Sequence, residues 1–309
     1  MSTGIQSSAR LLTRAVPRKR KNPHVGAWGF LLPSLVIMCA FTVWPMVQSA
    51  VRSLYSVRDG VWHYVGLAHY APLGNDPVFA QTLVNTAIFV LILVPVSVLL
   101  SLVLALLVNR RYRMTSLFRL AFFHPVVLPM VSAASIWLFL YTPDYGTVDQ
   151  LLAIFGLQQT NWLGQPQTAL FAVMVMTVWK QAGYFMMFYL AGLQGLSREA
   201  TEAAAVDGAG AWRTFREVTW PLLMPTPLFV TVLAVVGAVQ MVDQLYVMAQ
   251  GGPDNATSLL LFYIYQQAFS FQNIGKASAL SVLLIAVLVA FAVLQNWLDK
   301  KVHYEGDGA

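Results

Sequence analysis

Six long, nearly uncharged apolar stretches constrain this chain more than any other feature of its sequence. They lie near residues 28–51, 82–108, 119–142, 168–192, 226–248 and 276–298. A helix needs about 20 apolar residues to cross the hydrocarbon core of a bilayer. Charged residues make up only 10% of the chain, whereas an ordinary soluble domain has about 25%. The sequence therefore predicts an all-α polytopic membrane protein with six transmembrane helices.

The six stretches leave little room for a separate soluble domain. We expect one transmembrane domain over residues 28–298, with a cytoplasmic loop at 195–225 and short cytoplasmic tails at 1–27 and 299–309. The first stretch is longer than the apolar core of a signal peptide, which takes about 7–15 residues. We therefore expect it to remain in the protein as a membrane span.

Basic residues are distributed unevenly between the loops that join the spans. If the N-terminus is cytoplasmic, 15 of the 19 basic residues fall in cytoplasmic segments. These residues are Arg10, Arg14, Arg18, Lys19, Arg20, Lys21, Arg110, Arg111, Arg113, Arg119, Arg198, Arg213, Arg216, Lys300 and Lys301. Because cytoplasmic loops of membrane proteins carry an excess of Lys and Arg, both termini are predicted to be cytoplasmic.

The net charge of +6 is explained by this orientation signal and by attraction to anionic membrane lipid. It does not form the clustered basic surface that a nucleic-acid-binding domain needs. We expect membrane lipid, and no nucleic acid, as a partner.

Prolines and turn residues interrupt the apolar pattern. Pro95 in the second stretch and Pro125 and Pro129 in the third predict kinked helices, because proline removes a backbone hydrogen bond. Gly and Pro residues near 141–146 and 251–255 predict chain reversals in outer loops.

No catalytic pattern is found in the sequence. Gly275-Lys276-Ala277 lacks the upstream glycine and the hydroxyl of a phosphate-binding loop, and the five histidines form no HExxH motif. His63 and His69, with Asp59, share one outer loop, but two surface histidines are a commoner explanation than a metal site. Cys39 lies in an apolar stretch and is expected to be a packing residue. The chain is therefore predicted not to be an enzyme and to bind no metal or cofactor, so its driving energy must come from an ion gradient or from another polypeptide.

The loop between the fourth and fifth spans has the most informative local sequence. Ala203 and Ala204 favour a slim helix that Gly208 ends, and a second helical piece over about 212–218 is expected to stop at Pro221. The second piece carries Trp212 and Phe215. An exposed apolar surface of this kind is typical of a site that inserts into a partner. We call residues 195–225 the knob.

The knob resembles the cytoplasmic signature of the membrane subunits of binding-protein-dependent ABC importers. That signature is an EAA triplet, three residues, a glycine, nine residues and an aliphatic-x-x-Pro ending, and it is matched by Glu202-Ala-Ala204, Gly208 and Val218-x-x-Pro221. Trp220 stands where the family usually has leucine. Further segments resemble the carbohydrate-uptake branch, which includes the maltose and glycerol-3-phosphate importers, and within it the first permease subunit. They are Phe30–Pro33, Asn161–Gly164, Val178–Lys180, Ala191–Gln194 and Tyr246–Pro253.

The resemblance implies a type I ABC importer permease fold in the bacterial cytoplasmic (inner) membrane. It also implies a heterodimer with a second permease subunit, two cytoplasmic ATPase subunits that bind ATP and Mg, and an extracytoplasmic solute-binding protein. The residues that it assigns to ATPase coupling are Glu202, Ala203, Ala204, Asp207, Gly208, Trp212, Phe215 and Pro221.

Polar residues inside the spans are the candidates for a solute path. Lys180 lies near the middle of the fourth span, where a charge is costly, so its side chain is expected to face the bundle interior. Tyr184 is four residues further and shares its face, and Gln240 and Asp243 are expected to share a face of the fifth span. In maltose-type relatives the sugar-contacting positions align approximately with Lys180, Gln181, Tyr184, Gly237, Gln240 and Met241. Two interpretations of Lys180 stay open here: a structural ion pair with Asp243, or direct contact with solute.

The sequence does not identify the solute, since specificity is shared with the binding protein and the second permease. The resemblance implies a sugar or sugar-like solute, of which glycerol-3-phosphate is one. A secondary-active transporter of a small polar solute is the alternative, but it predicts internal repeats with ionisable pairs, and the sequence shows no clear repeat. A membrane-embedded enzyme would need the missing catalytic residues.

Overall fold

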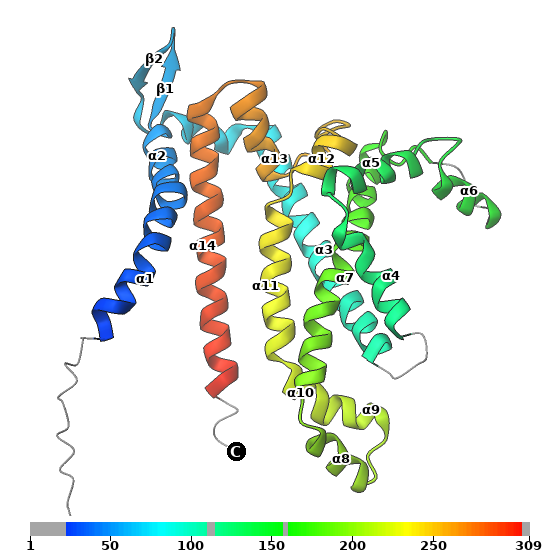
Figure 1. Cartoon of the computed structure of the whole chain (residues 1–309). Coiled ribbons are helices and arrows are strands. Elements are labelled where there is room, and N and C mark those ends of the chain that lie inside the picture. Colours follow the sequence, from blue (N-terminus) through cyan, green and yellow to red (C-terminus); the bar gives the residue numbers. More distant parts are fainter. Residues whose placement is uncertain (1–22, 110–114, 157–159, 305–309) are drawn as a thin grey trace, which may run out of the picture. The chain divides into compact units, whose positions relative to one another are not determined.

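The computed structural model of the chain describes residues 23–109, 115–156 and 160–304 (Figure 1). The chain consists of two compact units, Met1–Gln48 and Ser49–Ala309, and each is described by itself. In the first unit, α1 (Pro23–Met38) continues through one π-helical turn, η1 (Cys39–Val43), into α2 (Trp44–Arg52), which crosses the boundary between the units. The described apolar side chains of the first unit are largely exposed, among them Leu32, Val36 and Phe41.

The second unit contains a short hairpin and a bundle of helices. Its elements are β1 (Tyr55–Arg58), β2 (Val61–Tyr64), η2 (Gly66–His69), η3 (Ala71–Asn75), α3 (Pro77–Asn109), α4 (Thr115–Val127), α5 (Met130–Leu140), α6 (Thr147–Ile154), α7 (Pro166–Gly195), α8 (Arg198–Val206), α9 (Ala211–Thr214), η4 (Phe215–Thr219), α10 (Trp220–Leu223), α11 (Pro225–Val239), α12 (Asp243–Met248), α13 (Leu260–Tyr265), η5 (Gln266–Ser270) and α14 (Ile274–Tyr304).

Four helical segments of the described residues are long and apolar enough to span a membrane, namely Leu31–Arg52, α3, α7 and Ile274–Trp297 of α14. Two bent pairs bring the number to six if each is one span: α4 with α5, bent by 101°, and Ala211–Leu223 with α11, bent by 61°. The predicted fold class, a polytopic helical membrane protein, is confirmed, although the chain also contains a short β-hairpin.

The third apolar stretch is not one kinked helix, as the sequence suggested, but two helices with a sharp break at Leu128 and Pro129. Pro129 has no backbone N–H and its ψ of 142° is extended, so it ends one helix and begins the next. Pro95, in contrast, lies inside α3, which runs as a single helix of 33 residues.

The fifth apolar stretch also differs from the prediction of a continuous span over 226–248. Its helix α11 ends at Val239, and the chain turns before α12 begins at Asp243. The side chains of Leu245 and Met248 are buried in the same core as those of α5 and α7. Packing of α12 against this core therefore overrides the continuous apolar run that favoured one helix.

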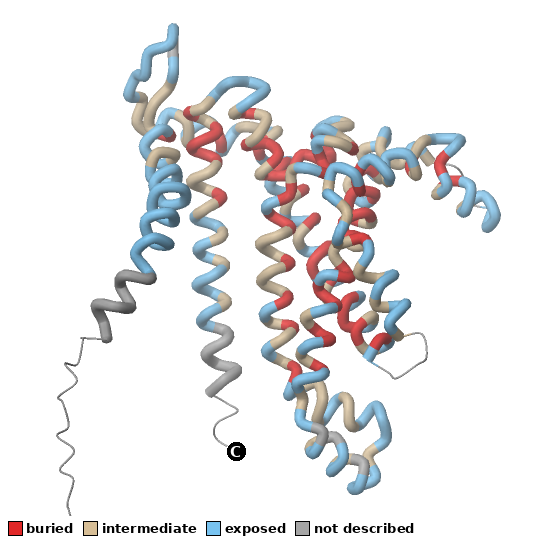
Figure 2. Tube along the Cα trace, in the orientation of Figure 1, coloured by how far each residue is buried: buried red, intermediate tan, exposed pale blue. Residues whose placement is uncertain are grey.

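The main core forms where α3, α7 and α11 lie side by side (Figure 2). Phe89 of α3, Met176 and Tyr189 of α7, Val230 of α11 and Leu245 of α12 are almost fully buried there. Exposed apolar residues cover the outside of the same helices, as expected for surfaces that face lipid or other membrane subunits.

The hairpin β1–β2 was not anticipated from the sequence. Tyr55 pairs with Tyr64, and Asp59 and Gly60 both adopt positive φ at its turn. The ring nitrogen Nε2 of His69 lies 3.0 Å from the carbonyl oxygen of Tyr55, so this histidine ties η2 to the hairpin.

The predicted reversal near 251–255 is confirmed. Gln250, Gly251, Asp254 and Asn255 have positive φ. The side-chain amide of Asn85 in α3 donates to the carbonyl of Asn255 at 2.8 Å, which holds the reversal against the bundle.

Candidate functional site

The knob folds as α8, α9, the π-helical turn η4 and α10, and it projects from the end of α7 opposite to α12 (Figure 1). Helix α8 ends at Val206, and Gly208, whose φ is +76°, turns the chain away from the helix axis two residues later. The N–H of Ala209 donates to the carbonyl of Ala204 at 2.9 Å, which is the six-to-one bond of a Schellman motif. The prediction that Gly208 ends the first helix of the knob is confirmed.

The second helical piece of the knob does not stop at Pro221. It runs from α9 through η4 into α10, which ends at Leu223. In η4 the N–H of Trp220 donates to the carbonyl of Phe215, five residues back. This wider turn accommodates Pro221 in the first turn of α10, where a missing N–H is tolerated.

Apolar and acidic side chains are exposed together on the knob. Glu202, Ala203 and Asp207 of its first half are exposed, and so is 74% of Trp212. The ring of Trp212 stacks on that of Phe215, with centroids 5.8 Å apart, which fixes the position of the indole. The knob is thus a preformed shape with an aromatic end and a small-residue helix, suited to insertion into a partner.

A cavity of about 540 Å³ lies between the knob and the ends of α3 and α7. Its lining residues are Val103, Leu106, Leu107, Asn109, Leu193, Ala211, Trp212, Phe215 and Thr219. The base of the knob therefore rests on the helix ends through a partly open apolar contact.

Lys180 of α7 is buried but does not pair with Asp243, so that interpretation is wrong. Its ammonium donates to the carbonyl oxygens of Pro125 at 2.7 Å, Val126 at 3.0 Å and Leu128 at 2.6 Å. Asp243 is exposed at the start of α12. The carbonyls at the break between α4 and α5 take the place of the expected carboxylate.

Gln181 and Gly237 are brought together by the packing of α7 against α11. A Cβ atom on Gly237 would lie 3.8 Å from Nε2 of Gln181. The Oε1 atom of Gln181 is buried and has no hydrogen-bond partner. Tyr184, one turn further along α7, is 42% exposed. Together they present polar atoms with free hydrogen-bonding capacity.

Gln240, Met241 and Asp243 do not share one helical face with Gly237, because the helix ends at Val239. Gln240 is exposed at the turn and Met241 is buried. The structure thus brings Gln181 and Gly237 into proximity, whereas Gln240 and Asp243 lie at and beyond the break.

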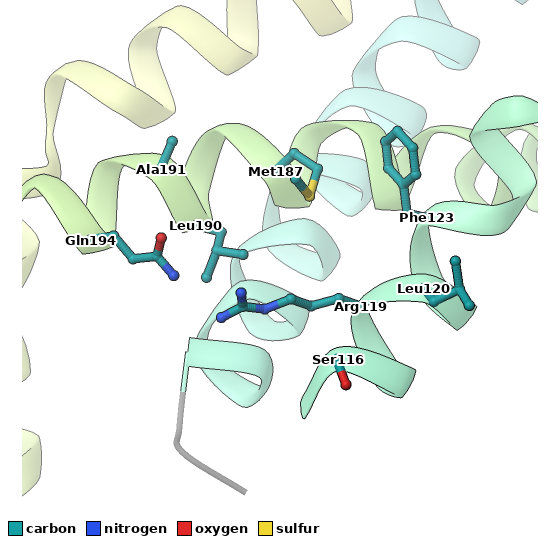
Figure 3. A pocket seen from close by; sticks show the side chains of 8 residues that line it. All are labelled: Ser116, Arg119, Leu120, Phe123, Met187, Leu190, Ala191 and Gln194. Carbon is teal, nitrogen blue, oxygen red and sulfur yellow. The ribbon is translucent and has the colours of Figure 1, made fainter. Parts of the chain in front are cut away.

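A second pocket continues the exposed face of α7 (Figure 3). Its volume is about 390 Å³, and it is lined by Ser116, Arg119, Leu120, Phe123, Met187, Leu190, Ala191 and Gln194. Tyr184, Met187, Ala191 and Gln194 follow at spacings of three and four residues, so they share one face of α7. Arg119 extends from α4 toward Leu190 and Gln194, and its Nε is buried without a partner. The sequence pattern of Arg119 and Gln194 did not predict that their side chains line a pocket.

A polar cluster joins the residue that precedes α3 with the first turn of α14 and with α13, and the sequence did not indicate it. Lys276 Nζ lies 2.8 Å from Oδ2 of Asp76 and 2.9 Å from the hydroxyl of Tyr263. Oδ1 of Asp76 accepts from the N–H groups of Val78 and Phe79 and caps α3. Burial raises the pKa of Asp76, but the hydrogen bonds from Lys276 and Phe79 outweigh it and the pKa lies below its usual value.

The helical bundle with its broken spans and projecting knob is that of a polytopic membrane protein. The family model described as "Binding-protein-dependent transport system inner membrane component" matches residues 71–304. The chain therefore belongs to this family, which makes it a multi-pass membrane subunit and not an enzyme.

Curated relatives agree with this assignment. The lactose transport system permease protein LacF of Rhizobium radiobacter is 35% identical over 90% of this chain and 95% of its own length. The sn-glycerol-3-phosphate transport system permease protein UgpA of Pectobacterium atrosepticum is 30% identical over 95% of this chain and 99% of its own length. The trehalose/maltose transport system permease protein MalF of Thermococcus litoralis is 30% identical over 85% of this chain and 90% of its own length.

The fold is also shared with a solved structure. A chain of a bacterial alginate ABC transporter in complex with an alginate pentasaccharide-bound periplasmic protein superimposes with a TM-score of 0.81. The match covers 90% of this chain and 95% of that chain, at 20% sequence identity. This likeness concerns the fold alone.

Proposed function

We propose that this chain is a membrane-spanning permease subunit of an ATP-driven importer for sugars or sugar-like solutes. The family match over residues 71–304 carries this proposal, together with the relatives named for lactose, sn-glycerol-3-phosphate and trehalose/maltose transport. The partners would be a second permease subunit, two cytoplasmic ATPase subunits that bind ATP and Mg, and an extracytoplasmic binding protein. Both termini would be cytoplasmic.

The knob would transmit the ATPase movement to the spans. Its support is geometric: α8 ends in a defined Schellman motif, Trp212 is held by Phe215, and the acidic residues Glu202 and Asp207 are exposed beside small side chains. A partner that grips this surface would pull directly on α7 and α11, since the knob is continuous with both helices.

The solute path would follow the exposed face of α7, from Gln181 and Tyr184 toward the pocket beside Arg119 and Gln194. Neutral amides and a phenol suit the hydroxyl groups of a sugar, because each donates and accepts hydrogen bonds. Gly237, Gln240, Met241 and Asp243 would contribute from α11 and the turn that follows it. Lys180 adjoins this face, but its three bonds to carbonyls leave its ammonium no free donor in this structure.

Uptake measurements in a strain that lacks this gene would test the proposal. We expect the deletion to abolish uptake of at least one solute among radiolabelled lactose, trehalose, maltose and sn-glycerol-3-phosphate, and the restored gene to recover it. Unchanged uptake of all four, together with unchanged growth on a broader panel of sugars and sugar phosphates, would contradict the solute class.

A further inference from the structure

A buried cation meets the break in the third apolar stretch. Lys180 comes from a different helix, is 8% exposed, and donates to three carbonyls of the segment 125–128. The axes of α4 and α5 differ by 101° immediately after these carbonyls. The cation and the break therefore occupy one place in the fold.

The break leaves these carbonyls without their usual partners. In a continuous helix the carbonyl of Pro125 would accept from the N–H of residue 129, but that residue is proline and has none. Val126 lies in the last turn of α4 and Leu128 lies just beyond its end. Neither carbonyl therefore has an N–H donor within α4. In a bilayer such groups must be satisfied within the protein, since no water is available.

The ammonium of a lysine fits this arrangement. It has three N–H donors and no acceptor, and here it meets three carbonyl oxygens at 2.6–3.0 Å. The C-terminal end of a helix carries a partial negative charge, which favours a cation there. The hydrogen bonds thus give the ammonium three acceptors and give each unpaired carbonyl a donor.

A close approach of the two backbones makes this contact possible. Gly183, one turn after Lys180, lies against the main chain of α4, and a Cβ atom there would collide with the carbonyl of Phe122. The side chain of Lys180 therefore reaches the end of α4 at short range. The same turn of α7 carries Gln181 and Tyr184 of the proposed path.

We propose that Lys180 is a positioning residue that holds the break between α4 and α5 in its bent form and does not contact solute. The bend sets the position of α4 and so the shape of the pocket that α4 forms with α7. Only the effect on transport rests on the proposed function, since the bend itself can be measured without any solute.

The test is a distance between spin labels on the full-length chain in membranes without solute. Labels at Leu117→Cys in α4 and Ser135→Cys in α5 use exposed positions, after the native Cys39 is replaced by Ala. A 101° bend places these Cα atoms about 18 Å apart, whereas a straight helix would separate them by about 27 Å.

Lys180→Met removes the donors and keeps the length of the side chain. Losing even one charge-assisted hydrogen bond shifts such an equilibrium by about tenfold or more, so the short distance should be lost or strongly broadened. Lys180→Arg keeps the cation and should retain more of the short distance. Thr177→Val is the control, because the hydroxyl of Thr177 donates to the carbonyl of Val173 within its own helix, and this variant should leave distance and uptake unchanged.

An unaltered short distance in Lys180→Met would overturn the proposal, whatever happens to uptake. If Lys180→Met does not accumulate in the membrane, Pro129→Ala in the same chain should restore its accumulation, because residue 129 then offers an N–H to the carbonyl of Pro125. Failure of the double variant to accumulate would also overturn it.

Discussion

One backbone angle, the φ of +76° at Gly208, shapes the end of the first knob helix. A residue with a branched side chain at this angle stores about 1–3 kcal/mol of strain. Apart from Gly208 and its two neighbours in the chain, no described atom lies within 4 Å of the position that a Cβ atom would take, so the strain would come from the backbone and not from a clash.

Gly208→Val should therefore distort the knob while the spans remain inserted. We expect uptake and co-purification of the ATPase subunits to fall together, with normal amounts of the chain in the membrane. Gly210→Ala is the matched control, because Gly210 has a negative φ of −68° and equally open surroundings. Wild-type uptake in Gly208→Val at normal expression would remove the knob from the transmission pathway.

The path residues allow a second test at this scale. Tyr184→Ala and Gln240→Ala each remove a polar side chain that is exposed and leave no buried charge without a partner. Assembly with the partner subunits should stay normal while uptake decreases. Normal uptake in both variants, measured over a range of solute concentrations, would show that the path lies elsewhere.

At the scale of elements, the ends of α3, α13 and α14 are joined by the cluster of Asp76, Tyr263 and Lys276. The two charged side chains are only 20% and 23% exposed, so their pair is partly shielded from solvent. Loss of one partner leaves the other charge poorly compensated.

Asp76→Asn keeps an oxygen that can cap α3 but removes the charge. We expect it to lower stability by about 1–3 kcal/mol at pH 7. Because the pKa of Asp76 is lowered in the folded protein, the ionised group stabilises the fold at neutral pH, and this contribution is lost as the pH falls through that lowered pKa.

The difference in thermal unfolding between wild type and Asp76→Asn should thus shrink as the solution is acidified. Lys276→Met and the double variant complete a cycle in which the two effects should not add. Additive effects, or a difference that persists at low pH, would show that the pair contributes nothing.

The long apolar helices and the Gly208 stop could be predicted because each depends on local sequence: uncharged length in one case and a positive φ in the other. The turn before α12 could not, because it depends on packing of Leu245 and Met248 against distant helices. The partners of Lys180 were also missed, since backbone carbonyls carry no signature in a sequence and become free only through the break at Pro129.

At the scale of the whole molecule, the orientation of the chain decides which surfaces meet which partners. The distribution of basic residues predicts that the knob is cytoplasmic. A cysteine at Ser197 in a Cys39→Ala background should resist an impermeant reagent in intact cells and react after lysis, whereas a cysteine at the exposed Tyr145 should react from outside. Labelling of the cysteine at 197 from outside, with protection of the cysteine at 145, would show that the chain has the opposite orientation in the membrane.

The proposed function requires that ATP hydrolysis in partner subunits drives transport through this chain. The most direct measurement is solute uptake into proteoliposomes that contain the assembled full-length complex, loaded with the solute-bound binding protein outside and with nucleotide inside. We expect uptake with ATP and Mg that is insensitive to ionophores and absent with a non-hydrolysable ATP analogue. Uptake sustained by an ion gradient without ATP, and abolished by ionophores, would contradict it.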